Sequence, residues 1–96
     1  MIERSGSWPF DAPRNLAVVT VRQVVDRTLP ILLVVHDAED GGWQFLTGLA
    51  FEVADGMLVC LEEIVELDAS VELADLPEGH EATRTHVGAP WQRRAE

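Results

Sequence analysis

The chain has 96 residues, the length of one domain, and its 47% hydrophobic and 25% charged residues are typical of a globular protein. Its net charge of −10 argues against binding to nucleic acid or to an anionic membrane, because phosphate contacts depend on Lys and Arg. A single cysteine, Cys60, excludes an internal disulfide and therefore a disulfide-stapled secreted scaffold.

The apolar segments of the chain indicate where the protein is located. Residues 1–16 contain four charged side chains and no apolar segment of the kind found in a signal peptide. The longest strongly apolar run, residues 29–35, is far shorter than the roughly 20 residues needed to span a bilayer. We therefore expect a soluble, cytoplasmic protein without a membrane partner.

The first part of the chain predicts an irregular lead-in followed by a single domain. Ser, Gly and Pro interrupt any period over residues 1–14, which we expect to precede an α+β domain of residues 15–96. Two aromatic residues in the lead-in, Trp8 and Phe10, are expected to pin it onto that domain.

The domain is expected to begin with a strand and a short helix. Residues 16–20 (LAVVT) are rich in β-branched side chains and predict a first strand. Thr20 and Gln23 fit the spacing of a capping box, which predicts a short helix ending near Arg27. The alternative is that the strand continues, because the valines that follow Thr20 also favour strand.

A β-hairpin is the clearest element in the pattern. Residues 31–35 form a continuous apolar run after Pro30, which is typical of a strand covered on both faces. Residues 37–42 (DAEDGG) have the composition of a turn, and residues 43–47 (WQFLT) predict the returning strand. We therefore expect an antiparallel hairpin.

The second half predicts further short elements. Residues 49–55 are ambiguous, Asp55 and Gly56 indicate a turn, and residues 57–60 fit either a short strand or the approach to a helix. From Leu61 the apolar residues recur at helical spacing, so a helix is expected there.

The final elements complete the predicted fold. Residues 70–76 predict a further helical turn, closed by the Pro and Gly that follow, and residues 81–87 predict a last strand. The expected fold is thus α+β, with a small antiparallel sheet of three to five strands and two short helices packed on it.

Several motifs follow one another in an order that resembles a known family. They are residues 18–24 (VVTVRQV), 40–48 (DGGWQFLTG), 61–64 (LEEI), 68–70 (DAS) and 76–84 (LPEGHEATR). This order resembles a bacterial domain family of unknown function that is grouped with immunity proteins of polymorphic toxin systems. The resemblance implies a small α+β fold and a role in binding and neutralising a toxin, and it brings no catalytic residues.

Charge is strongly segregated along the chain. All 7 positive side chains are arginines, and none lies within residues 28–83, which hold 13 Asp and Glu. Such a run is either a solvated face or a surface for a basic partner. The partner-binding candidates are Asp37, Glu39, Asp40, Glu62, Glu63, Glu66 and Trp91, with packing in the core as the alternative for Trp91.

The same residues allow a weaker chemical interpretation. His36, Asp37, Glu39 and Asp40 could offer ligands to a hard cation, but their spacing departs from a calcium loop, and a plain turn explains the composition. Cys60 is expected to be a buried, inert thiol rather than a nucleophile, because Glu62 and Glu63 disfavour its thiolate. We expect no catalytic residue, metal or cofactor.

These observations together predict a non-enzymatic protein-binding domain whose acidic face occludes a basic partner surface, such as that of a toxin. One alternative is a stand-alone regulatory or scaffold subunit with no toxin partner. Another is a metal-dependent hydrolase that uses the cluster of residues 36–40. The sequence does not determine the oligomeric state.

Overall fold

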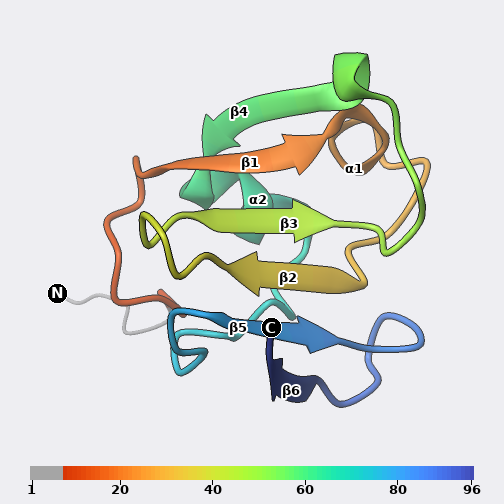
Figure 1. Ribbon diagram of the computed structural model, residues 1–96. Coiled ribbons are helices and arrows are strands. Elements are labelled where there is room, and N and C mark those ends of the chain that lie inside the picture. Colours follow the sequence, from red (N-terminus) through yellow and green to blue (C-terminus); the bar gives the residue numbers. More distant parts are fainter. Residues whose placement is uncertain (1–7) are drawn as a thin grey trace, which may run out of the picture.

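A six-stranded mixed sheet forms the centre of the protein in the computed structural model, which describes residues 8–96 (Figure 1). The strands are β1 (Ala17–Val21), β2 (Leu33–His36), β3 (Trp43–Leu46), β4 (Gly56–Cys60), β5 (His80–Thr83) and β6 (Gln92–Ala95). The helices are α1 (Arg22–Val25), α2 (Leu61–Leu67) and the 3₁₀ turn η1 (Val53–Asp55). The predicted α+β class is confirmed, and so are a short helix after the first strand and a helix beginning at Leu61.

The strands lie in the order β4-β1-β3-β2-β5-β6. The predicted hairpin is confirmed, because β2 and β3 pair in antiparallel fashion with Val34 opposite Phe45. The other neighbours are also antiparallel, except for β1 and β3, which run parallel. The first strand therefore lies between two strands that come later in the chain.

The predicted sheet of three to five strands is too small. Strand β6, which the sequence pattern did not indicate, pairs with β5 at one edge and is exposed at all four residues. Its sequence, Gln-Arg-Arg-Ala, lacks the apolar alternation of a half-buried strand. The final strand predicted over residues 81–87 is β5, which ends at Thr83.

Three local predictions were wrong. Thr20 does not cap α1, because it lies buried in β1 and its hydroxyl donates to the carbonyl oxygen of Phe45 at 2.7 Å. Asp55 and Gly56 do not form a turn, since Asp55 ends η1 and Gly56 begins β4 with extended backbone. Residues 70–76 form no helix but an irregular segment. That segment still buries Val71, Leu73 and Leu76 in the core, so their apolar spacing reflects packing rather than helix.

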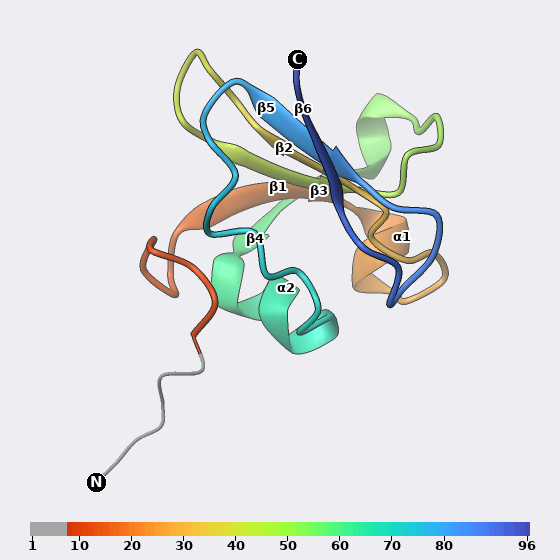
Figure 2. The same ribbon diagram turned by 90° about the horizontal axis from the view of Figure 1, so that it is seen from below.

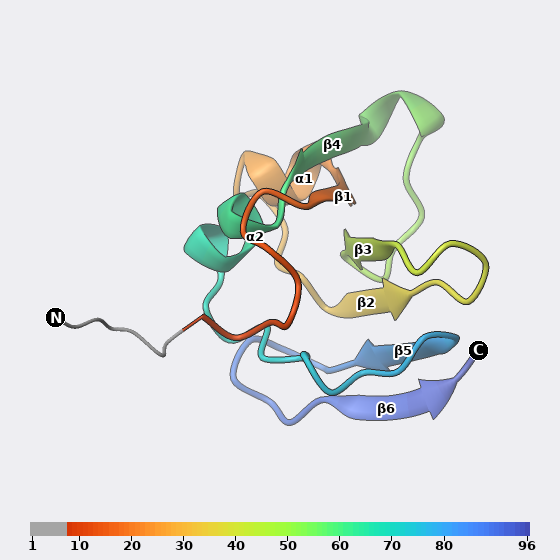
Figure 3. The same cartoon turned by 90° about the vertical axis from the view of Figure 1, so that its left-hand side faces the viewer.

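The hydrophobic core lies on one face of the sheet. Figures 2 and 3 show α1 and α2 on that face, and neither helix covers the other face. Residues 8–14 are irregular, yet Phe10 is buried in the core and its ring lies edge-on to the rings of Trp43 and Phe45. The two strands at the ends of the sheet, β4 and β6, leave one side unpaired.

Candidate protein-binding surface

Exposed apolar side chains gather along the segment that ends in β4. Figure 1 shows this segment running from the end of β3 past the side of the sheet to η1 and then into β4. Val53 is 95% exposed, Leu58 73% and Leu49 63%, although large apolar residues are normally buried. We call the exposed apolar residues here the apolar edge; they are Leu49, Phe51, Val53, Met57 and Leu58, with Val19 opposite Leu58 in the neighbouring strand.

Leu49 also borders a hollow on the side of the sheet without a helix. The hollow has a volume of about 540 Å³ and is lined by Leu33, Thr83 and Arg94 among others. The hollow therefore adjoins the apolar edge at Leu49 and lies beside β2 and β5.

The backbone register of β4 determines which of its polar groups point outward. The N–H of Leu61 donates to the carbonyl oxygen of Leu16, and the pairs two and four residues further along the ladder, 18 with 59 and 20 with 57, have the same phase. In an antiparallel ladder alternate pairs exchange hydrogen bonds, so the N–H and C=O groups of residues 56, 58 and 60 point away from β1.

Two of these three outward N–H groups have partners within the chain. The N–H of Gly56 donates to the carbonyl oxygen of Val53, and that of Cys60 donates to Oε1 of Glu63 at 3.3 Å. Leu58, between them, has no comparable cap among residues 8–96. An unpaired donor and acceptor on an edge strand are groups that another strand can bind.

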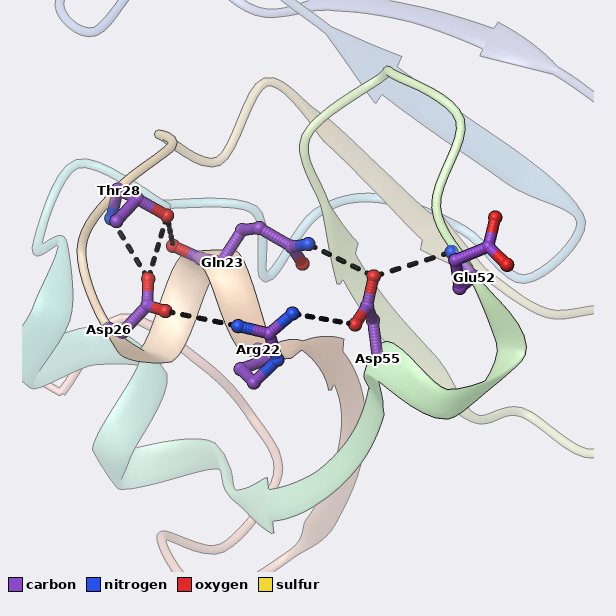
Figure 4. A network of polar contacts seen from close by, with 6 residues as sticks. All are labelled: Arg22, Gln23, Asp26, Thr28, Glu52 and Asp55. Carbon is purple, nitrogen blue, oxygen red and sulfur yellow. Dashed lines mark hydrogen bonds and ion pairs between the residues drawn. The ribbon is translucent and has the colours of Figure 1, made fainter.

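A polar network fastens the start of β4 to α1 (Figure 4). Asp55 accepts hydrogen bonds from Nε2 of Gln23 at 3.0 Å and from Nη2 of Arg22 at 2.9 Å. The hydrogen bonds from Gln23 and then from Arg22 lower the pKa of Asp55 below its ordinary value. Arg22 also lies 3.7 Å from Asp26. The apolar edge is thus held on the fold at its η1 end.

The acidic candidates do not form one surface. Figures 2 and 3 show α2 on one side of the sheet and the turn of residues 37–42 reaching toward the other. In that turn, Asp37 accepts a hydrogen bond from Gln44, and Asp40 accepts one from the N–H of Gly42, while Glu39 is exposed. Glu78 lies beside this turn, since a Cβ added to Gly41 would lie 2.8 Å from its Oε2.

The three acidic candidates on α2 adjoin the apolar edge, because α2 follows β4 without an intervening residue. Glu62 accepts a hydrogen bond from Arg14 at 3.1 Å, which neutralises part of this group. Glu66 is exposed, and Glu63 is exposed and caps Cys60. Carboxylates and apolar side chains therefore occupy adjacent parts of the same edge.

Trp91 covers a buried arginine. Its indole N–H donates to the carbonyl oxygen of Ser70 at 3.1 Å, and the guanidinium of Arg84 lies 4.2 Å from its ring centroid. Arg84 itself donates to the carbonyl oxygen of Ile31, to Oγ of Ser70 and to Oδ2 of Asp68. Trp91 is thus placed by packing against Arg84 and Ser70. Its half-buried ring exposes less apolar surface than the apolar edge does.

This arginine network also acts on Asp68. Burial alone would raise the pKa of Asp68, but the hydrogen bonds from Ser70 and Arg84 outweigh it and hold the pKa below its ordinary value. Sequence reasoning missed the role of Arg84, although Asp68, Ser70 and Arg84 all belong to the ordered motifs. Nothing in their spacing of 14 to 16 residues indicates that they meet.

The side chains of residues 36–40 contact different groups and do not form one site. His36 stacks on Trp43 with ring centroids 3.9 Å apart, and its Nδ1 lies 2.7 Å from the carbonyl oxygen of Leu76. Within residues 8–96, no three His, Cys, Asp or Glu side chains converge as a group that could hold a metal ion. The side chains of the turn bond instead to neighbouring groups of the hairpin.

Cys60 contradicts the prediction of a buried thiol, because it is exposed. It lies at the end of an edge strand and points outward there, although its neighbours Val59 and Leu61 are half-buried and buried. An apolar run indicates burial only if both faces of the strand are covered.

Comparisons with known proteins identify no relative of the chain. No protein-family model, curated protein or solved structure matches the chain. The resemblance to the family grouped with immunity proteins therefore depends on the sequence motifs. Among residues 8–96, no helix combines the length and the apolar character needed to cross a membrane.

Proposed function

We propose that the protein is a non-enzymatic, cytoplasmic binding domain whose apolar edge covers a surface of a basic partner protein. The observation that carries this proposal is the exposure of Leu49, Val53 and Leu58 along one edge of a small domain. Exposed apolar side chains that lie close together on a small protein are characteristic of interaction sites. The apolar edge thus takes the place of the wholly acidic face that the sequence suggested.

The apolar side chains supply the affinity. Full burial of a Val or Leu side chain contributes about 1.5–3 kcal/mol, and Val53 and Leu58 keep most of their surface exposed in the free protein. A contact that buries these two and Phe51 would therefore gain several times the thermal energy before the costs of association.

The carboxylates favour a partner whose surface carries positive charge. Glu63 and Glu66 lie exposed on α2 directly after β4, and Glu52 lies exposed between Phe51 and Val53. With a net charge of −10, the protein attracts basic surfaces and repels acidic ones, which affects association rate and orientation more than affinity. The resemblance to immunity-associated domains agrees with a toxin as that partner.

Co-purification from the native host tests the proposal. We expect the tagged protein to retain a basic protein, and the double variant Val53→Ser/Leu58→Ser to lose it. The matched control is Leu29→Ser/Val87→Ser, which alters exposed apolar residues outside the apolar edge and should retain the partner. If the partner is a toxic enzyme, the protein is its antidote; any other basic partner favours the regulatory or scaffold subunit.

Charge reversal tests the acidic part of the surface. Glu63→Lys/Glu66→Lys should slow association severalfold at low salt, whereas Glu39→Lys/Asp40→Lys makes the same change of charge on the distant turn and should affect association less. Retention of the partner by both the serine variant and the Glu63/Glu66 variant would refute the proposal.

A further inference from the structure

We infer that the partner contributes an extended segment that pairs with β4 as a seventh strand, with an apolar side chain beside Leu58 and Lys or Arg at its ends. This inference rests on the proposed function, since it specifies how the apolar edge is covered. The occupant is a basic segment of another protein.

The hydrogen-bonding register of β4 leaves the groups of Leu58 open to an added strand. The outward N–H and C=O of Leu58 lie at the middle of the edge, where a partner residue opposite Leu58 could exchange two hydrogen bonds with it. Leu58 is 73% exposed, so the same partner residue could cover its side chain. Backbone pairing and apolar contact thus coincide at one residue.

The two edges of the sheet differ in charge. Strand β6 carries Arg93 and Arg94, and charged side chains protect an edge strand from pairing. Strand β4, of sequence Gly-Met-Leu-Val-Cys, carries no charge and no proline. The edge that lacks this protection is also the edge that exposes the apolar residues.

Carboxylates flank both ends of β4. The η1 end carries exposed Glu52, with Asp55 paired to Arg22, and the α2 end carries Glu63 and Glu66. If two copies paired in antiparallel fashion about Leu58, the α2 end of each would approach the η1 end of the other, and carboxylates would meet carboxylates. A segment with an uncharged centre and basic ends meets no such repulsion.

Glu63 would cap the edge strand in the free protein, and the partner would displace it. Its carboxylate caps the N–H of Cys60 at 3.3 Å, near the upper limit for such a bond. A backbone carbonyl of the added strand could replace it, and the released carboxylate could then pair with a basic side chain of the partner. The outward N–H groups available to the partner would thereby rise from one to two.

The test uses NMR titration of the isotope-labelled protein with a blocked peptide, RRVTVTVRR. We expect saturable shifts that are largest at Leu58 and Cys60, together with slower hydrogen exchange of the Leu58 N–H. Methylating alternate backbone nitrogens on the pairing side of the peptide should weaken binding about tenfold or more, because strand pairing is then blocked. Replacing its arginines by glutamates should weaken binding as well.

The matched variant is Leu58→Pro, which removes the outward donor. The N–H of Leu58 takes no part in the β1 ladder, and proline is tolerated on edge strands where the N–H faces solvent. Peptide binding should be lost while the remainder of the spectrum stays native. If that variant does not fold, Leu58→Lys serves instead, because it alters only an exposed side chain and places a charge at the centre of the edge.

The outcomes separate the inference from the proposed function. Equal binding of the N-methylated peptide, or no saturable shift at Leu58 at millimolar peptide, overturns strand addition, while co-purification of a basic partner would still support the binding domain. A wild-type dimer in sedimentation that Leu58→Pro dissociates would assign the edge to a second copy and overturn the choice of occupant. If no basic protein co-purifies, both the proposed function and the strand addition are contradicted.

Discussion

At the level of single residues, Arg84 has the most demanding environment. Its side chain is 1% exposed, and its guanidinium binds Ile31, Ser70 and Asp68 beneath the ring of Trp91. A buried charge is tolerated only when it is paired and hydrogen-bonded. Removing one partner leaves the other buried without its hydrogen bonds. This residue therefore joins the end of β5 to the segments before β2 and after α2.

Asp68→Asn tests this network. The pKa of Asp68 is depressed in the fold, so the stability it contributes is fully present above its unfolded pKa of about 3.9 and is lost as the pH falls through the folded pKa. We expect the substitution to cost about 2–4 kcal/mol in urea unfolding at pH 7, with the difference from wild type shrinking toward pH 3. Asp75→Asn, which breaks the exposed pair with Arg93, should cost about 1 kcal/mol or less. Equal losses for the two variants would contradict the network's importance.

At the level of elements, the 3₁₀ turn η1 positions the apolar edge. Asp55 accepts hydrogen bonds from Arg22, Gln23 and the N–H of Glu52, so a single carboxylate ties η1 to α1. Without it, β4 would be held at its start only by the ladder to β1.

Asp55→Asn should therefore loosen the η1 end of β4. We expect faster hydrogen exchange of the N–H groups of Met57 and Val59, which point toward β1, and little change at Ala82 in β5. Because the pKa of Asp55 is depressed in the fold, lowering the pH through that pKa should loosen the wild-type protein in the same way. Asp40→Asn is the control, and equal protection of β4 in both variants would show that η1 does not depend on Asp55.

The elements differ in how far the sequence predicts them. The hairpin and α2 were predictable, because their apolar periods and turn residues act locally. Strand β6 was not, since its stability comes from pairing with β5 and from ion pairs such as that of Arg94 with Glu81. The acidic candidates were visible as composition, but the apolar edge was not. An apolar run such as residues 57–60 has the same sequence pattern whether its strand is central or at an edge.

At the level of the whole molecule, the arginines return to the acidic stretch that separates them in sequence. Each of five arginines lies within 4.0 Å of a carboxylate; the pairs join Arg14 to Glu62, Arg22 to Asp55, Arg84 to Asp68, Arg93 to Asp75 and Arg94 to Glu81. The excess negative charge is therefore divided between the turn of residues 37–42 and the outer side of α2, rather than spread over one face.

The order of the strands also predicts an order of folding. The β2–β3 hairpin closes over a short turn, whereas β1 must find Gln44 and Leu58, which lie far along the chain. We expect Val34→Ala in the hairpin to slow folding, and Val18→Ala in β1 mainly to speed unfolding. Stopped-flow measurements in urea would reveal this, and equal slowing of folding by both variants would contradict it.

The position of β1 has a consequence during synthesis. Its partners β3 and β4 follow it in the chain, so the valine-rich first strand emerges from the ribosome before either exists. Both of its sides are unpaired until residue 46 has left the exit tunnel, and the side that β4 covers stays unpaired until residue 60 has left; an exposed apolar strand is prone to aggregate. The nascent chain is thus most vulnerable in the interval between the appearance of its first strand and the completion of β4.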